Sequence, residues 1–205
     1  MIPLKNMKTI DGILALLCGA VVGSVISELL QGSRIDLGIH YDVILWLALA
    51  VISFISLWLA YLAGRKIPFV FQAAKFFLVG AFATVFDLKL FEFLAWFFGL
   101  FLVVNPLVLK GVSFFISTFL KYWANKYWTF QKHGAEDIYQ QITIFFIADM
   151  IGVFINVTAF YYFTNMLGPQ FSMPEAAWVK LSVIFAGLVA AGWNFLGYKF
   201  LVFKK

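Results

Sequence analysis

Residues 43–63 read VILWLALAVISFISLWLAYLA and contain no charged side chain. An α-helix needs about 20 consecutive apolar residues to cross the hydrocarbon core of a bilayer. The stretch therefore predicts a membrane-spanning helix. Of the 205 residues in the chain, 63% are hydrophobic and 12% are charged. This composition excludes an ordinary soluble enzyme and a disordered protein, because it leaves too little polar surface to cover a globule. The single cysteine, Cys18, also excludes a disulfide scaffold.

The same reasoning predicts helices on both sides of this stretch. Asn105 and Pro106 supply an N-cap and a proline at the first helical position, so a new helix begins there. The polar run 131–141 is expected to be a loop, and the glycine and prolines of 168–174 mark another turn. The fold class is therefore all-α and polytopic, with about six transmembrane helices. The expected ranges are 13–30, 43–63, 71–98, 105–128, 142–166 and 176–200.

The basic residues predict how the helices are oriented. By the position of these helices, 11 cations fall on one side of the membrane, whereas Arg34 falls on the other. Loops rich in Lys and Arg stay in the cytoplasm. We therefore expect a multi-pass protein of the cytoplasmic membrane with both termini in the cytoplasm. The 11 cations are Lys5, Lys8, Arg65, Lys66, Lys75, Lys121, Lys126, Lys132, Lys199, Lys204 and Lys205.

The last four helices contain an internal repeat. Residues 76–94 (FFLVGAFATVFDLKLFEFL) align without gaps on residues 145–163 (FFIADMIGVFINVTAFYYF). The partner helices also end alike, with NKYWTF at 125–130 and YKFLVF at 198–203. Both copies cross the membrane in the same direction, so they are parallel repeats of a helix hairpin. We predict a four-helix domain over 71–205 and a two-helix membrane extension over 1–70.

One helix carries a polar stripe. Its members are spaced by three, four, four and four residues, which places them on one face of a helix over roughly 22 Å. Such a stripe would let a phosphate cross between leaflets with ammonium groups as partners. In the alternative interpretation the lysines extend to opposite interfaces and the serines bond their own backbone. The stripe consists of Lys110, Ser113, Ser117, Lys121 and Asn125.

Three further polar residues lie within apolar helices. The repeat pairs Asp87 with Asn156, and Asp149 lies two turns before Asn156. Charged groups in hydrocarbon are costly and mark functional sites. The three side chains are therefore expected to face a shared polar interior that binds sugar hydroxyls or a proton. The alternative is a set of interhelical hydrogen bonds that only holds the bundle together.

Other motifs point to anchoring and packing. Both repeat endings mix cations, amides and aromatic rings where lipid phosphates lie, which suits a lipid headgroup or a simple interfacial anchor. Gly19 and Gly23 form a GxxxG motif that predicts close helix packing. His40 and His133 have no ligand partners at metal-binding spacing, so no metal or cofactor is expected. No catalytic triad or phosphate-binding loop is present, so no enzymatic activity is expected.

The segment from Lys75 to Lys205 resembles the GtrA-like family of small membrane proteins. It opens with an FxxxG-like start, FFLVG at 76–80, followed by an acidic residue, Asp87. The hairpin endings resemble the family pattern N-F-x-x-N-[RK]-x-W-[TV]-F, as KYWANKYWTF at 121–130 and NFLGYKFLVF at 194–203. Lys121 replaces the first Asn in one copy, and Tyr198 and Leu201 replace the second Asn and the Trp in the other.

The resemblance implies translocation of a polyprenyl-phosphate-linked monosaccharide for cell-surface polysaccharide or teichoic acid glycosylation. A polyprenyl-phosphate glycosyltransferase, membrane lipids and a second copy of the chain are the expected partners, and nucleic acid is not. The expected polar pathway consists of Ser113, Ser117, Asp87, Asp149 and Asn156. The lipid-phosphate site is expected to use Lys110, Lys121, Asn125, Lys126, Lys180, Asn194 and Lys199.

Two other functions remain open from the sequence. In the first, the chain is a membrane scaffold that recruits a glycosyltransferase, and the additional first two helices favour this function. In the second, the chain is a proton-coupled exporter of small molecules that uses Asp87 or Glu92. Alanine substitutions along the stripe, and the response of transport to pH and to Asp87→Asn, separate these functions.

Overall fold

The computed structural model describes residues 7–32, 41–99, 105–134, 137–170 and 173–204. Every regular element in these ranges is helical, and six helices are long and apolar enough to cross a membrane. The expected all-α polytopic membrane protein is therefore confirmed. The chain forms two compact units, Met1–Gln131 and Lys132–Lys205. The domain boundary after residue 70 and the orientation of the termini stay predictions, and Lys5, Arg34, His40 and Lys205 lie outside the described residues.

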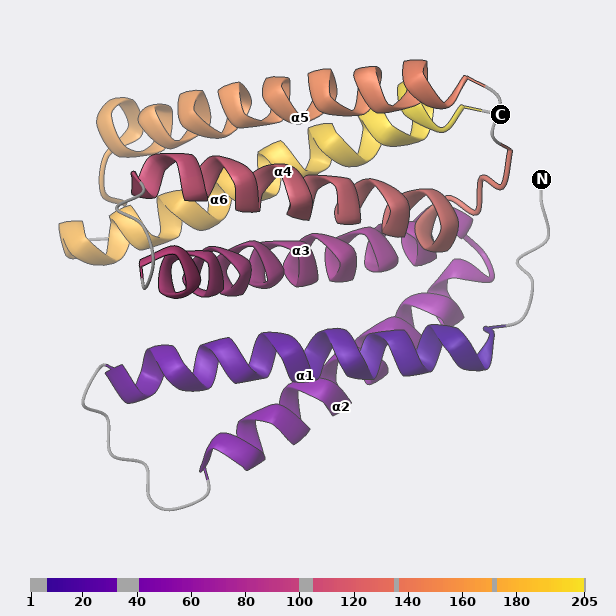
Figure 1. The fold of residues 1–205 in the computed structure, drawn as a ribbon, viewed down its shortest axis with the longest axis horizontal. Helices are drawn as coiled ribbons and strands as arrows, with labels where there is room; N and C mark the ends of the chain where they lie inside the picture. Colours follow the sequence, from indigo (N-terminus) through magenta and orange to yellow (C-terminus); the bar gives the residue numbers. More distant parts are fainter. Residues whose placement is uncertain (1–6, 33–40, 100–104, 135–136, 171–172, 205) are drawn as a thin grey trace. The chain divides into compact units, whose positions relative to one another are not determined.

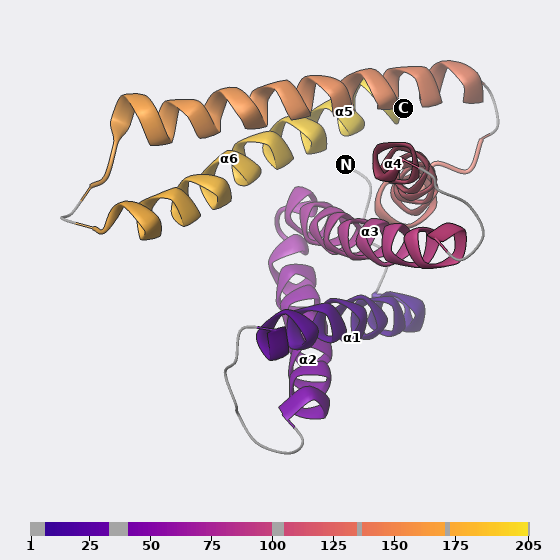
Figure 2. The same cartoon turned by 60° about the vertical axis from the view of Figure 1, so that its left-hand side comes forward.

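The first unit contains four of the long helices and one π-helical turn (Figure 1). Helix α1 packs against α2, and both also contact α3. Helix α4 lies alongside α3 in both views (Figures 1 and 2). The ranges are α1 (Thr9–Gly32), α2 (Tyr41–Gly64), α3 (Pro68–Gly99), α4 (Pro106–Ala124) and the π-helical turn η1 (Asn125–Thr129).

The GxxxG motif packs α1 closely against α2. A Cβ atom added at Gly19 would lie 2.3 Å from the carbonyl oxygen of Leu49 and 2.7 Å from the Cα atom of Ala50. At Gly23 the added atom would lie 3.0 Å from the Cα atom of Trp46. Glycine is thus needed for the two backbones to approach, as small residues do between membrane helices. The predicted packing role of the motif is confirmed.

The second unit is a helix hairpin. Helices α5 (Ile138–Tyr161) and α6 (Glu175–Gly197) lie side by side, and each continues into a π-helical turn, η2 (Tyr162–Leu167) and η3 (Tyr198–Val202) (Figure 2). The expected loop over 131–141 is too long by four residues, because α5 already begins at Ile138. Gln140 and Gln141 are good helix formers, so they extend the helix despite their polarity.

The helix ends follow the predicted local chemistry. The Asn105 side chain accepts a hydrogen bond of 2.9 Å from the backbone N–H of Leu107, with Pro106 at the first helical position. Gly168 stops η2 with φ of 64°, a conformation that glycine adopts without steric cost. Apolar side chains such as Ile44 and Leu47 on α2, Leu107 on α4 and Phe154 on α5 are exposed, as lipid-facing positions require.

Candidate functional site

The first repeat copy ends in a buried polar turn. After α4 the backbone continues as the π-helical turn η1, and the N–H of Phe130 donates to the carbonyl of Asn125 over 2.8 Å. Asn125 and Lys126 are 0% exposed, and Thr129 is 2% exposed. Single π-helical turns are frequent at functional sites, because they redirect the side chains that follow. Here the turn brings an amide, an ammonium group and a hydroxyl into the protein interior.

The ammonium group of Lys126 lies among aromatic rings. Its Nζ atom is 5.8 Å from the ring centroid of Tyr122, 5.7 Å from that of Trp123 and 6.0 Å from that of Tyr127. The negative faces of such rings stabilise a cation that has lost its water. The aromatic rings therefore help to hold this positive charge inside the first unit.

The neighbouring acceptors are incompletely satisfied. Asn125 donates from Nδ2 to the carbonyl of Lys121 over 2.9 Å. Among the described residues, Asn125 Oδ1 and Thr129 Oγ1 are buried and have no hydrogen-bond partner. A buried polar atom without a hydrogen-bond partner costs free energy, and a group that bonds to it lowers that cost. Hydroxyl groups of a sugar, which both donate and accept, match these two atoms.

The second copy has the same backbone and different chemistry. In η3 the N–H of Phe203 donates to the carbonyl of Tyr198 over 2.8 Å, as Phe130 does to Asn125 in η1. Tyr198 stands where Asn125 stands in the first copy. Its hydroxyl donates to Asp149, and its ring stacks on Phe145 with 4.3 Å between centroids. At this position the second ending has a hydroxyl with a hydrogen-bond partner, whereas the first ending has the Asn125 Oδ1 atom without one.

The remaining predicted residues of α5 and α6 pack within their own hairpin. The Asn194 amide lies over Gly152, where an added Cβ atom would be 2.3 Å from Asn194 Oδ1. Lys199 Nζ lies 5.9 Å and 5.7 Å from the ring centroids of Phe195 and Phe200. Asn156 is partly exposed. The Lys180 side chain lies outside the described residues, so its role stays a prediction.

The polar stripe ends in an ion pair at the far end of the first hairpin. Lys110 on α4 pairs with Asp87 on α3, and Ser113 Oγ lies 2.7 Å from Asp87 Oδ1. The side chain of Lys110 is 47% exposed and that of Asp87 is 18% exposed. The sequence predicted the stripe and the importance of Asp87, but it did not pair Asp87 with Lys110. The expected shared interior of Asp87, Asp149 and Asn156 stays a prediction, since these residues belong to different units.

Between its ends the stripe follows the buried face of α4. Ser113 is 0% exposed and Ser117 is 4% exposed. Ser117 Oγ donates to the carbonyl of Phe114 over 2.9 Å, as the packing interpretation expected. Ser113 Oγ lies 3.0 Å from the carbonyl of Lys110, as the packing interpretation expected. It also contacts Asp87, so it belongs to the polar cluster with Lys110 as well. Lys121 is partly buried one turn before Asn125.

The structure contains a buried ion pair that the sequence analysis did not predict. Lys75 is 1% exposed and Asp11 is 3% exposed, with 2.6 Å between Nζ and Oδ1. The indole N–H of Trp128 donates to the same oxygen over 2.8 Å. We counted Lys75 only as a positive-inside residue. The available signal was that Asp11 and Lys75 are opposite charges inside apolar stretches near the same side of the membrane.

Comparison with known proteins supports one family. The family model described as GtrA/DPMS, transmembrane domain, matches residues 75–203. This range begins at the buried Lys75, within α3, and contains the rest of both hairpins and the π-helical turns η1 and η3. No curated protein and no solved structure matches the chain significantly. Because the matched range covers more than half of the sequence, the chain belongs to the GtrA/DPMS transmembrane-domain family, as its repeated hairpin endings indicated.

Proposed function

We propose that this protein translocates a polyprenyl-phosphate-linked monosaccharide across the cytoplasmic membrane for cell-surface polysaccharide or teichoic acid glycosylation. The single observation that carries the proposal is the α3–α4 hairpin, which holds a polar cluster at each end. One end has Lys126 and the open acceptors of Asn125 and Thr129. The other has Lys110 with Asp87 and Ser113. Family membership supports a role in the handling of polyprenyl-phosphate sugars.

In this proposal the lipid phosphate enters at η1. Lys121 and Lys126 attract the phosphate, while Asn125 and Thr129 bind hydroxyl groups of the sugar. Lysine suits the role, because its ammonium group is a compact point charge with three rotatable donors. The prenyl chain remains in the lipid, so the helices need to shield only the headgroup. By the positive-inside rule, we expect this end to lie on the cytoplasmic side.

The headgroup would then move along the buried hydroxyls of α4 toward Lys110. There Asp87 competes with the phosphate for the ammonium group, because both are anions at the same partner. This competition favours release, since Asp87 regains its ion pair as the phosphate leaves. The mechanism involves no bond breaking, and we accordingly propose a transporter and not an enzyme.

A transport assay tests the proposal. Purified protein in liposomes would be loaded with a radiolabelled polyprenyl-phosphate sugar, and the headgroup that becomes accessible on the far side would be followed in time. We expect Lys110→Ala and Lys121→Ala to abolish exchange while the protein stays folded. Lys66→Ala is the matched control, because Lys66 is exposed in the turn between α2 and α3. Exchange at the wild-type rate in both stripe variants would overturn the mechanism.

A scaffold function is the second candidate. Helix α2 exposes apolar side chains along much of its length, including Ile44, Leu47, Ile52 and Leu59, and this surface would suit a partner membrane protein. A scaffold for a polyprenyl-phosphate glycosyltransferase should tolerate alanine along the α4 stripe. Loss of co-purification of the enzyme after Leu47→Ala and Ile52→Ala, with no lipid exchange by the wild type, would favour this function over transport.

A further inference from the structure

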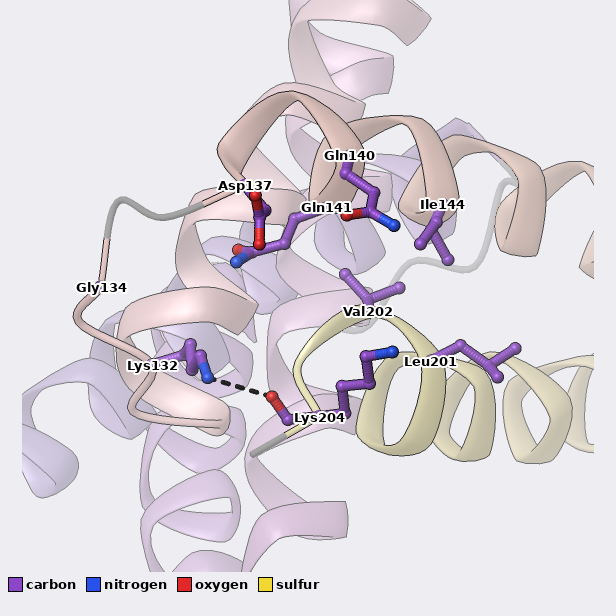
Figure 3. A pocket seen from close by; sticks show the side chains of 9 residues that line it. All are labelled: Lys132, Gly134, Asp137, Gln140, Gln141, Ile144, Leu201, Val202 and Lys204. Atoms are coloured by element: carbon purple, nitrogen blue, oxygen red, sulfur yellow. Dashed lines mark hydrogen bonds between the residues drawn. The ribbon is translucent and has the colours of Figure 1, made fainter.

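A pocket of about 320 Å³ lies in the second unit (Figure 3). Its lining residues come from three places, which are Lys132 and Gly134 before α5, the start of α5 (Asp137, Gln140, Gln141 and Ile144), and the end of the second hairpin (Leu201, Val202 and Lys204). Pockets for small molecules begin at about 300 Å³, so this one suits a group as small as a single sugar. The polar stripe and the η1 turn belong to the first unit, and none of their residues lines the pocket.

The lining has the chemistry of a sugar phosphate site. Lys132 and Lys204 bring two ammonium groups, and Lys132 Nζ donates to the carbonyl of Lys204 over 3.0 Å. Asp137 offers acceptors, and the amide of Gln140 offers both donors and acceptors. Sugar hydroxyls need such mixed partners, whereas a phosphate needs the cations.

The pocket also has an apolar side. Ile144 follows Gln140 by one turn on α5, and Leu201 belongs to η3. Figure 3 shows Lys132 and Asp137 on one side of the pocket and Ile144 and Leu201 on the other. A ligand with a polar head and an apolar tail that continues along the helices matches this division.

We propose that this pocket is a second headgroup site, separate from η1, which recognises the sugar of a phosphate-linked glycolipid and so determines which sugar the protein accepts. The inference rests on the proposed function for its choice of ligand. In it, Gln140 and Asp137 bind sugar hydroxyls, and Lys132 and Lys204 bind the phosphate. The apolar residues contact the first isoprene unit of the tail.

Binding measurements on the full chain in nanodiscs test the pocket. The probes are polyprenyl phosphate, polyprenyl-phosphate glucose, polyprenyl-phosphate mannose and soluble glucose 1-phosphate. We expect the wild type to bind at least one sugar-bearing lipid more tightly than bare polyprenyl phosphate. Gln140→Ala and Asp137→Ala should each reduce this preference by about threefold to tenfold, the effect of one lost hydrogen bond. Neither variant should change the affinity for bare polyprenyl phosphate.

Two control variants separate the sugar from the phosphate and from the fold. Lys132→Ala should weaken all four probes alike, since all carry a phosphate. Thr143→Ala lies on α5 outside the pocket, where Thr143 bonds its own backbone, and should change nothing. Equal affinity for glucose 1-phosphate and the glucose lipid would identify a soluble sugar phosphate as the ligand of the same site.

The outcomes distinguish this inference from the proposed function. If the wild type shows no sugar preference, or if Gln140→Ala and Asp137→Ala leave it unchanged, sugar recognition by the pocket is overturned even if transport proceeds. If the preference falls in both variants, sugar recognition by the pocket is supported. A lack of lipid exchange in liposomes would then overturn only the transport function.

Discussion

Lys75 and Asp11 form an ion pair in the interior of the first unit, with 2.6 Å between Nζ and Oδ1 and almost no solvent exposure on either side chain. The pair joins α1 to the start of α3, where the family match begins. Trp128 of η1 donates to the same carboxylate. The N-terminal extension is thereby connected to the ending that we propose as the lipid-phosphate site.

Breaking this pair should be strongly destabilising. Lys75→Met leaves a buried carboxylate without its cation, which costs about 3–5 kcal/mol of the free energy of unfolding. The double variant Lys75→Met with Asp11→Asn should recover most of the loss, because asparagine is neutral and still accepts from Trp128. Thermal unfolding in detergent measures both. A double variant no more stable than Lys75→Met would show that the carboxylate charge is not the cause.

Removing the open amide of η1 should have opposite effects on stability and transport. Asn125→Leu eliminates the buried Oδ1 atom, so we expect the free energy of unfolding to rise by about 1 kcal/mol. Transport should fall, since a sugar hydroxyl loses its partner. Unfolding and lipid exchange would be measured on the same preparation. A variant that is both less stable and fully active would contradict the assignment of this amide to a ligand.

The Tyr198 hydroxyl should matter for stability. Tyr198→Phe removes a donor from the buried Asp149 carboxylate and should lower the free energy of unfolding by about 1–3 kcal/mol. The ring can still stack on Phe145, so the loss isolates the hydrogen bond. Tyr139→Phe is the control, because Tyr139 is 85% exposed. Equal melting temperatures for the two variants would argue against a stabilising bond.

The glycines on α1 offer a direct test of helix packing. Gly19→Ala forces a methyl group against the backbone of α2 and should cost about 1–3 kcal/mol. Gly111→Ala on α4 meets nothing within 4 Å and should be neutral or stabilising by up to about 1 kcal/mol, since alanine favours a helix. Detergent unfolding curves of the two variants decide this, and a stable Gly19→Ala protein would mean that α1 and α2 pack less closely.

A compensating pair tests the second hairpin. Gly152→Ala places a Cβ atom on the Asn194 amide and should destabilise the hairpin, whereas adding Asn194→Ala removes the obstacle and should restore stability. A double-mutant cycle of unfolding free energies gives the coupling between the two positions. Additive effects would show that the two side chains do not meet.

Much of the fold follows from local sequence. Apolar length predicted the six helices, Asn105 and Pro106 predicted the start of α4, and the repeat predicted that the two hairpins would end alike. The Asp11–Lys75 pair was not predictable in the same way, because its partners are 64 residues apart and meet only through tertiary packing. The π-helical form of the endings was also not predicted, since no residue of NKYWT or YKFLV requires it.

The candidate site was likewise predictable from the sequence only in part. Residue spacing predicted that Lys110, Ser113, Ser117, Lys121 and Asn125 share one face of a helix, and the structure places the first four on α4 and Asn125 in η1. The difference between the two endings depends on the partner helix, because Tyr198 reaches Asp149 while the repeat places Gly80 opposite Asn125. The pocket at Lys132 and Gln140 was not predicted from the sequence. Its residues come from the segment before α5 and from two helix ends, and in the sequence they resemble ordinary polar surface.

The hydrogen bond between Tyr198 and Asp149 makes the two hairpin endings chemically unequal. The first ending presents an amide oxygen that has no protein partner, whereas the second has at the same position a hydroxyl that bonds within its own hairpin. A search pattern that requires the amide at both endings would therefore fail to match this chain.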